Sequence, residues 1–388
     1  AKEESINTIL ELSQHKDRGR CRALLVAGCL AQRYAHDLLV DMPEIDAVIG
    51  TGSIPELTGV IHRALNGEKV LLVGKPGYLH TAESPKVQAT PFYSAYLKIA
   101  EGCDNCCTYC TIPHVRGPFR SRDADDILTE AASMAACGVT ELTLVAQDTT
   151  RYGMDRYNKS SLHTLLSRLT HLEELVWIRL LYTYPALLND DLIQLMAEEE
   201  KLCRYLDIPL QHASTPVLQR MNQRGSGEQS ARLIEKLHAA IPDITLRTTF
   251  IVGFPGETER DFEELLQFMS EIQFDRVGIF QYSREEGTPA ATLPDQVPEE
   301  LKQERRNRAM ALQQKISWKK NQLKVGRVLK VLVEGRNPRG VYFGRSEGDA
   351  PDVDGKVYFK APLELSPGEY VKVRVTAARA YDLNGELV

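Results

Sequence analysis

Four absences bound what this 388-residue sequence can be. It contains no run of about 18 apolar residues, so we expect no membrane-spanning helix. It shows no signal peptide and no low-complexity tract, so nothing marks it as a secreted or disordered chain. It has no excess of positive charge. The formal net charge is −6, so the chain as a whole does not attract nucleic acid and suits a basic partner.

Cysteine, by contrast, is concentrated in one place. Eight cysteines are present, and four of them lie between Cys103 and Cys110. This crowding fits a metal site in a reducing compartment better than a disulfide framework, so we expect a cytoplasmic protein. The chain length and the ordinary shares of apolar (43%) and charged (26%) residues predict two or three globular domains.

Residues 1–75 have the pattern of an α/β domain. Short buried strands are expected at 23–27 and 45–49, with helices at 6–12 and 54–65. Residues 76–91 contain three prolines and no periodicity, so we interpret them as a linker.

Residues 92–322 alternate strands with helices. Strands are expected at 96–100, 140–146, 176–181, 205–208, 245–252 and 276–282. Helices are expected at 123–137, 162–172, 189–199, 228–240 and 257–272, the first with Asp123 as its N-cap. This βα order predicts a parallel sheet curled into a partial (β/α)6 barrel, with the active site at the carboxyl ends of the strands.

A charged helix at 298–324 precedes an all-β domain at 323–388. Strands at 327–334, 340–344, 355–359 and 370–377, separated by Gly and Pro turns, predict a small β-barrel. This barrel is nearly neutral, but Glu347–Asp354 gathers four acidic residues, which we expect to be a surface for a basic partner. The alternative is a solvated turn.

The cysteine loop carries the strongest chemical signal. Cys103, Cys107 and Cys110 give the spacing C-x3-C-x2-C, and three thiolates on one loop suit a [4Fe–4S] cluster with one iron left open. Zinc is the alternative, and His114 would then be its fourth ligand. Cys106 interrupts the pattern and is interpreted as a bystander, although it could also exchange with a ligand.

This loop, with Tyr109 before its last cysteine, resembles the radical S-adenosylmethionine (SAM) superfamily. The stretches Gly102–Gly117, Arg120–Arg122 and Arg247–Glu257 are similar to those of its methylthiotransferases, and the likeness extends over essentially the whole chain. The resemblance implies a partial N-terminal α/β methylthiotransferase domain, a radical SAM barrel and a C-terminal TRAM β-barrel. It also implies that the open iron binds SAM, which is cleaved to a 5′-deoxyadenosyl radical, and that Tyr109 packs beside the adenine. The alternative for Tyr109 is a structural wall residue under the loop.

Three further stretches resemble the branch of this family that modifies a ribosomal protein. They are Ala146–Gly153, Tyr205–His212 and Arg345–Gly355. The resemblance implies methylthiolation of the β-carbon of an aspartate in small-subunit ribosomal protein twelve, with a flavodoxin as a candidate electron donor. The alternatives are the same chemistry on a tRNA adenosine, which the charge disfavours, and a non-catalytic metal-binding or ribosome-binding module.

Members of this branch hold a second cluster on three separated N-terminal cysteines. Gly28–Tyr34, with Cys29, resembles the third of these, and Ala1–Ser5 resembles the sequence soon after the second. Cys21 lies outside the pattern. We therefore expect an N-terminally truncated chain with two clusters in the intact protein and one complete cluster site here, able to cleave SAM but not to transfer sulfur.

Several polar residues at strand ends have both a functional and a structural interpretation. Gln147 and Asp148 are expected to bind the methionyl group of SAM or to cap the following loop. Arg247 is expected to pair with a cofactor or substrate carboxylate or to form a structural ion pair. Glu257 could be a first-turn acid of a helix, and His212 a packed polar residue. Cys137 and Cys203 lie on or beside apolar stretches and are expected to be buried structural thiols.

Overall fold

The computed structural model describes residues 2–388, so Ala1 of the Ala1–Ser5 match lies outside the described part. The chain separates into two compact units. The first contains residues 1–80, 101–106 and 110–120, and the second contains 81–100, 107–109 and 121–388. Most of the cysteine segment, which was expected in the second domain, therefore packs with the first unit, whereas the C-terminal barrel shares a unit with the large sheet.

The first unit is a three-stranded parallel sheet in the order β1-β2-β3, covered by helices. Ile45, Val48 and Ile49 are fully buried in its core. The helix that begins at Cys29 was not predicted. The elements are α1 (Lys2–Arg18), β1 (Leu25–Ala27), α2 (Cys29–Asp41), β2 (Ala47–Ile49), the 3-10 turn η1 (Ile54–Glu56), α3 (Leu57–Leu65), β3 (Val70–Leu72) and α4 (Ile112–Arg116).

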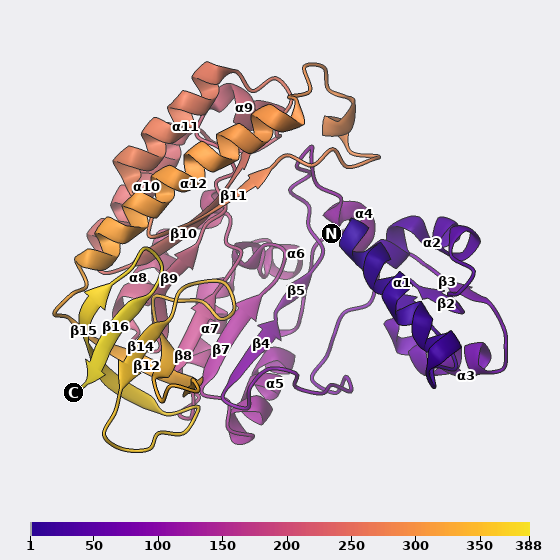
Figure 1. The fold of residues 1–388 in the computed structure, drawn as a ribbon, viewed down its shortest axis with the longest axis horizontal. Helices are drawn as coiled ribbons and strands as arrows, with labels where there is room; N and C mark the ends of the chain where they lie inside the picture. Colours follow the sequence, from indigo (N-terminus) through magenta and orange to yellow (C-terminus); the bar gives the residue numbers. More distant parts are fainter. Residues whose placement is uncertain (1) are drawn as a thin grey trace. The chain divides into compact units, whose positions relative to one another are not determined.

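The second unit contains the six expected strands in βα order, which confirms the predicted architecture (Figure 1). All neighbours pair in parallel, in the order β11-β10-β9-β8-β7-β4, and the sheet stays open between β11 and β4. The barrel is therefore partial. The strands are β4 (Ser94–Lys98), β7 (Glu141–Val145), β8 (Trp177–Leu180), β9 (Leu202–Asp207), β10 (Thr245–Val252) and β11 (Arg276–Gln281).

The helices of this sheet begin at side-chain caps. Asp123 accepts the Asp125 N–H at 2.9 Å, as predicted, and Thr258 forms a capping box with Asp261. The main helices are α5 (Ala124–Ala136), α7 (Leu162–Leu169), α8 (Asp190–Glu198), α10 (Gly227–Ala240) and α11 (Glu259–Ile272). Shorter elements are β5 (Ala100–Glu101) paired with β6 (Arg120–Ser121), η2 (Thr149–Arg151), α6 (Met154–Tyr157), η3 (Pro185–Leu187), α9 (Thr215–Arg220) and η4 (Pro289–Thr292).

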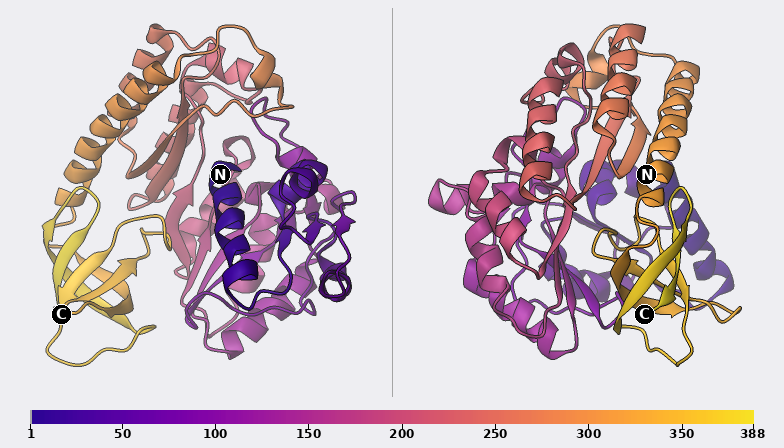
Figure 2. Two further views of the ribbon diagram at one scale, coloured as in Figure 1. Left: turned by 45° about the vertical axis from the view of Figure 1, so that its right-hand side comes forward. Right: turned by 90° about the vertical axis from the view of Figure 1, so that its left-hand side faces the viewer.

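The long helix α12 (Glu299–Gln322) leads from the sheet into a closed five-stranded barrel, drawn in yellow in Figure 2. Val331, Val333 and Val373 are completely buried inside it. The strands run in the order β12-β13-β14-β16-β15, and β16 was not predicted. Their bounds are β12 (Val328–Arg336), β13 (Tyr342–Ser346), β14 (Val357–Lys360), β15 (Tyr370–Ala378) and β16 (Leu383–Leu387).

Among residues 2–388, no helix is both long enough and apolar enough to cross a membrane.

The acidic loop between β13 and β14 does not have the role expected from its charge. Arg345, just before it, holds Glu141 at the start of β7 with two hydrogen bonds of 2.9 and 2.5 Å. Ser94 on β4 donates to the same carboxylate at 2.8 Å, and Arg179 on β8 lies 3.3 Å from it. Burial alone would raise the pKa of Glu141, but Arg345 and Arg179 lower it to about 2.

The loop continues across the remaining strands. Asp349 pairs with Arg276, the first residue of β11, at 2.7 Å, and Asp354 accepts the hydroxyl of Tyr205 on β9 at 2.7 Å. Asp349 and the side chain of Asp354 are only 2% and 3% exposed. The expectation of an acidic surface, and its alternative of a solvated turn, are therefore wrong for these two residues. Their charges instead neutralise arginines of the sheet, and only Asp352 and Val353 at the tip are exposed.

Candidate active site

The part of the cysteine loop in the first unit is fixed by its own backbone. Gly102 has a left-handed φ of +84°, and any Cβ there would clash with the carbonyl oxygen of Pro118, so the turn requires glycine. The Cys103 N–H donates to Gly117 at 3.2 Å, and the Asp104 carboxylate accepts the Phe119 N–H at 3.0 Å. These bonds close the segment from residue 102 to residue 119 into one loop.

Two of the three expected ligands are described in this unit. Burial raises the pKa of the Cys110 thiol, and the nearby Cys103 raises it further, while the Ile112 N–H lowers it. That N–H lies 3.4 Å from the Cys110 sulfur, and the Asn105 N–H lies 3.5 Å from the Cys103 sulfur. Two neighbouring thiolates repel each other, and a bound cation would remove that repulsion.

The second unit contributes Cys107, Thr108 and Tyr109. The backbone of Thr108 donates to Met221 O at 3.1 Å and accepts from the Ala290 N–H at 3.0 Å, so this part of the loop is anchored at both sides. The Tyr109 ring packs at an edge against Phe254, with ring centroids 6.3 Å apart, in an apolar cluster at the carboxyl ends of β10 and β11. This contact matches the alternative of a wall residue, and contact with adenine stays a prediction.

Gln223 was not predicted from the sequence. Its side-chain amide lies 2.9 Å from the Cys107 sulfur and 3.1 Å from the Tyr109 hydroxyl. No sequence signal marks it, because it lies 116 residues beyond Cys107 in the turn after a six-residue helix, α9.

The donor set fits an iron–sulfur cluster. In the first unit the sulfurs of Cys103 and Cys110 each accept a backbone N–H, and in the second unit the Cys107 sulfur accepts an amide N–H of Gln223. Such outer-shell hydrogen bonds are those that cluster thiolates use. Cys106 is exposed and has a left-handed φ of +52°. Among the described residues 2–388, no group of three or more His, Cys, Asp or Glu side chains within one unit is close enough together to hold a metal ion.

The Gly253–Glu257 turn after β10 is held from inside. Glu257 accepts the N–H groups of Gly253 (2.6 Å) and Phe254 (3.1 Å) and pairs with Arg305 at 3.0 Å. Helix α11 begins only at Glu259, so the interpretation of Glu257 as a first-turn acid is wrong. Burial raises the pKa of Glu257 to about 7, although Arg305 and the two N–H groups oppose that shift.

His212, after β9, faces this turn. It is completely buried, and burial lowers its pKa to about 3, so it is neutral at physiological pH. Its Nδ1 accepts the Ser214 N–H at 3.0 Å, so the proton is on Nε2, which lies 3.8 Å from a Glu257 oxygen. His212 and Glu257 therefore form one buried polar unit beneath the turn.

The other expected cofactor residues have structural partners. Asp148 accepts the Thr150 hydroxyl at 2.6 Å and the Arg151 N–H at 3.2 Å, so it caps η2, while Gln147 beside it is half-buried. Arg247 pairs with Asp207 at 3.2 Å and with Asp354 of the acidic loop at 3.8 Å. Arg247 also lies six residues before Gly253, roughly 20 Å along an extended strand. The structure thus shows the structural ion pair, and contact of Arg247 with a cofactor or substrate carboxylate stays a prediction.

The remaining cysteines divide by exposure. Cys203 is buried, and burial raises its pKa to about 12, which fits the expected structural thiol. Cys137 is exposed at the end of α5, so the expectation of a buried thiol is wrong there. Cys29 is the first residue of α2 and is exposed, and Cys21 donates to its neighbour Ala23 O at 3.4 Å.

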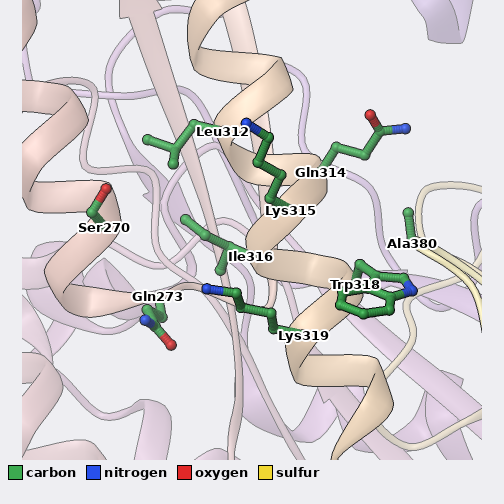
Figure 3. A pocket seen from close by; sticks show the side chains of 9 residues that line it. All are labelled: Ser270, Gln273, Leu312, Gln314, Lys315, Ile316, Trp318, Lys319 and Ala380. Carbon is green, nitrogen blue, oxygen red and sulfur yellow. The ribbon is translucent and has the colours of Figure 1, made fainter.

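A groove of about 540 Å³ lies on the outer helices, between α11 and α12 (Figure 3). Trp318 and Leu312 supply its apolar part, and Lys315 and Lys319 its charge. None of its lining residues is a Cys, His, Asp or Glu, so it offers neither metal ligands nor an acid–base pair. The groove is therefore not the active site.

Comparison with known proteins supports the interpretation of the cysteine loop as a cluster-binding site. The model of the radical SAM superfamily matches residues 97–269, and that of the TRAM domain matches residues 325–388. The chain is 63% identical to "Ribosomal protein uS12 methylthiotransferase RimO" of Pelotomaculum thermopropionicum, over 100% of this chain and 88% of the relative. It is 53% identical to the protein of the same name from Desulforudis audaxviator, over 100% and 86%. The chain belongs to the RimO family of radical SAM methylthiotransferases.

Family membership confirms the sequence-based resemblance and the enzyme class, and it supports an iron–sulfur cluster and SAM as cofactors. Among solved structures, the chain is similar to the radical SAM methyltransferase TsrM of Kitasatospora setae. The TM-score is 0.57 at 13% identity, with 79% of this chain and 73% of that chain covered. At this identity the likeness concerns the fold alone.

Proposed function

We propose that this RimO-family enzyme attaches a methylthio group to the β-carbon of an aspartate in ribosomal protein uS12. The names of its relatives support uS12 as the substrate. The observation that carries the chemistry is the cysteine loop, in which each of three thiol sulfurs accepts an N–H.

Cys103, Cys107 and Cys110 would hold a [4Fe–4S] cluster and leave one iron for SAM. When bound, cluster and SAM supply a one-electron reduction and a radical strong enough to remove hydrogen from an unactivated C–H bond. The residues around them position and shield these groups. Tyr109 and Phe254 provide an apolar wall, and a dry wall protects a radical from side reactions.

The chain's polar residues would orient the cofactor without reacting. Glu257 and neutral His212 hold the Gly253 turn at the carboxyl end of β10. Gln147 would offer its amide to the polar end of SAM, whereas Asp148 caps η2. Neither the Glu257 nor the His212 side chain is exposed, so they act through the backbone they support.

We also propose Cys29 as one ligand of an auxiliary cluster that provides sulfur, and a flavodoxin-type protein as electron donor. One thiol does not hold a cubane, so iron bound through residues 1–388 alone would occupy the three-cysteine loop. Iron analysis of the anaerobically reconstituted chain should give about four irons per chain. A value near eight would contradict this single complete site.

Mass spectrometry tests the function. The full-length enzyme, reconstituted with both clusters, is incubated with SAM, dithionite and a sulfide source, in parallel with uS12 in small subunits, free uS12 and unmodified tRNA. A methylthio mass increment on one uS12 aspartate is expected, together with 5′-deoxyadenosine, and Cys110→Ser should give neither. An increment on tRNA adenosine, or none on uS12 when 5′-deoxyadenosine forms, would reject uS12 as the substrate.

A further inference from the structure

Gln223 is a side chain outside the cysteine motif that directly approaches an expected cluster ligand. Its amide nitrogen lies 2.9 Å from the Cys107 sulfur and 3.1 Å from the Tyr109 hydroxyl. A primary amide carries two hydrogens, so one group can donate to both acceptors at once.

The fold aims this amide at the loop. The Gln223 N–H donates to Leu218 O at 2.9 Å, and Asn222 takes a left-handed φ of +57°, so the chain reverses directly after α9. The same helix end holds the loop itself. Thr108 donates its N–H to Met221 O at 3.1 Å and its hydroxyl to Arg220 O at 2.8 Å. Gln223 and Cys107 are thus attached to one rigid corner.

We propose that Gln223 is a positioning residue for the cluster. It would donate a hydrogen bond to the iron-bound Cys107 thiolate and fix the orientation of Tyr109. This inference rests on the proposed function, because it assumes that Cys107 ligates iron. Hydrogen bonds to cluster sulfurs withdraw electron density and stabilise the reduced state, so Gln223 should raise the reduction potential of the cluster.

Gln223→Leu tests the proposal, because it keeps the side chain's approximate size and removes both donors. Gln219→Leu is the matched control, since Gln219 lies on α9, the helix directly before Gln223, and is exposed. The readouts are iron content and the midpoint potential from a titration followed by electron paramagnetic resonance. We expect Gln223→Leu to shift the potential to a more negative value at unchanged iron content, and Gln219→Leu to match the parent.

Gln223→Lys restores a donor of sufficient length and should return the potential toward that of the parent. If Gln223→Leu binds no iron although its circular dichroism is unchanged, recovery of iron in Gln223→Lys supports the same role, and no recovery overturns it. Equal potentials for Gln223→Leu and Gln219→Leu also overturn it. Failure of the parent chain to bind any cluster would instead reject the proposed function.

Discussion

The two ends of the six-stranded sheet use buried polar side chains in opposite ways. At the amino ends of the strands, every main cation has a carboxylate beside it: Arg345 has Glu141, and Arg276 has Asp349. At the carboxyl ends, the Cys107 thiol and neutral His212 accept N–H donors, and the carboxylates of Asp148 and Glu257 accept backbone N–H groups. Paired charges cancel and fix how the C-terminal barrel packs against the sheet. N–H donors around a sulfur can instead stabilise a bound cofactor.

The comparison also separates two kinds of pKa shift. Glu141 is lowered because Arg345 stabilises its charge, and Glu257 is raised because burial outweighs its partners. Shifts of the second kind are typical of functional sites. Four predictions test this contrast.

The largest effect is expected where a pair is broken. Arg345→Met leaves Glu141 buried with Arg179 as its remaining cationic partner. We therefore expect the free energy of unfolding, measured in urea, to fall by about 3–5 kcal/mol. The triple variant Glu141→Gln/Arg179→Met/Arg345→Met removes all three buried charges and should recover most of that loss. If the single variant costs less than about 1 kcal/mol, the network is not a stabilising interface.

The second prediction concerns pH and the carboxyl end. His212 has a pKa of about 3 in the fold against 6.5, so its contribution is present above pH 6.5 and is lost as the pH falls toward 3. Glu257 has a pKa of about 7 against 4.5, so its contribution is present below pH 4.5 and is lost as the pH rises through 7. The two slopes oppose each other, and the parent should change little between pH 4.5 and 6.5.

Single variants should reveal each slope. His212→Asn keeps an acceptor for the Ser214 N–H and should lose stability as the pH rises, whereas Glu257→Gln should lose stability as the pH falls. Each slope is at most about 1.4 kcal/mol per pH unit, or roughly 2 kcal/mol over this window. Glu141, lowered from 4.5 to about 2, should act only at lower pH, where its contribution disappears. Slopes of the same sign in both variants would contradict the assignment.

A smaller loss is expected for one hydrogen bond of the network. Tyr205→Phe removes the 2.7 Å bond to Asp354 and should cost about 1–2 kcal/mol, since the buried carboxylate loses a donor. Tyr358→Phe, on β14 in the same barrel, should stay within about 0.5 kcal/mol. Production of 5′-deoxyadenosine should be unchanged in both. A large decrease in 5′-deoxyadenosine production by Tyr205→Phe would show that this hydrogen bond also affects the chemistry at the carboxyl ends of the strands.

The smallest effect on stability is expected at a cysteine that would bind the cluster. Cys107→Ser should leave the unfolding free energy of the metal-free chain within about 0.5 kcal/mol, because the thiol is only partly buried. The same variant should lose nearly all cluster iron. Strong destabilisation of the metal-free protein would show that the loop is a structural element first.

Local patterns predicted much of this molecule. Alternating strands and helices, and three cysteines at short spacing, are signals within one stretch of chain, and the six strands were found in the expected order. Distant pairings left no such signal. Gln223 meets Cys107 across 116 residues, and Arg345 meets Glu141 across 204.

The acidic loop shows why charge alone misled. Glu347, Asp349, Asp352 and Asp354 have the composition of a solvated surface, and their count cannot reveal that Arg276 and Arg247 lie opposite two of them. Similarly, the sequence does not distinguish a glutamate that faces solvent near the start of a helix from one that, like Glu257, accepts N–H groups of the preceding turn. Only the tertiary structure distinguishes these cases.

The burial of the acidic loop limits how this enzyme can be recombined. Arg345 contacts β7 through Glu141, and the loop that follows it contacts β8 through Arg179, β9 through Tyr205 and β11 through Arg276. A C-terminal barrel transplanted from a relative would therefore have to bring matching carboxylates, or leave several arginines buried without a counterion. The radical SAM domain and the TRAM domain match separate family models, but their buried charges pair with one another. We therefore expect a substitution of a paired charge in one domain to be tolerated only with a complementary substitution in the other.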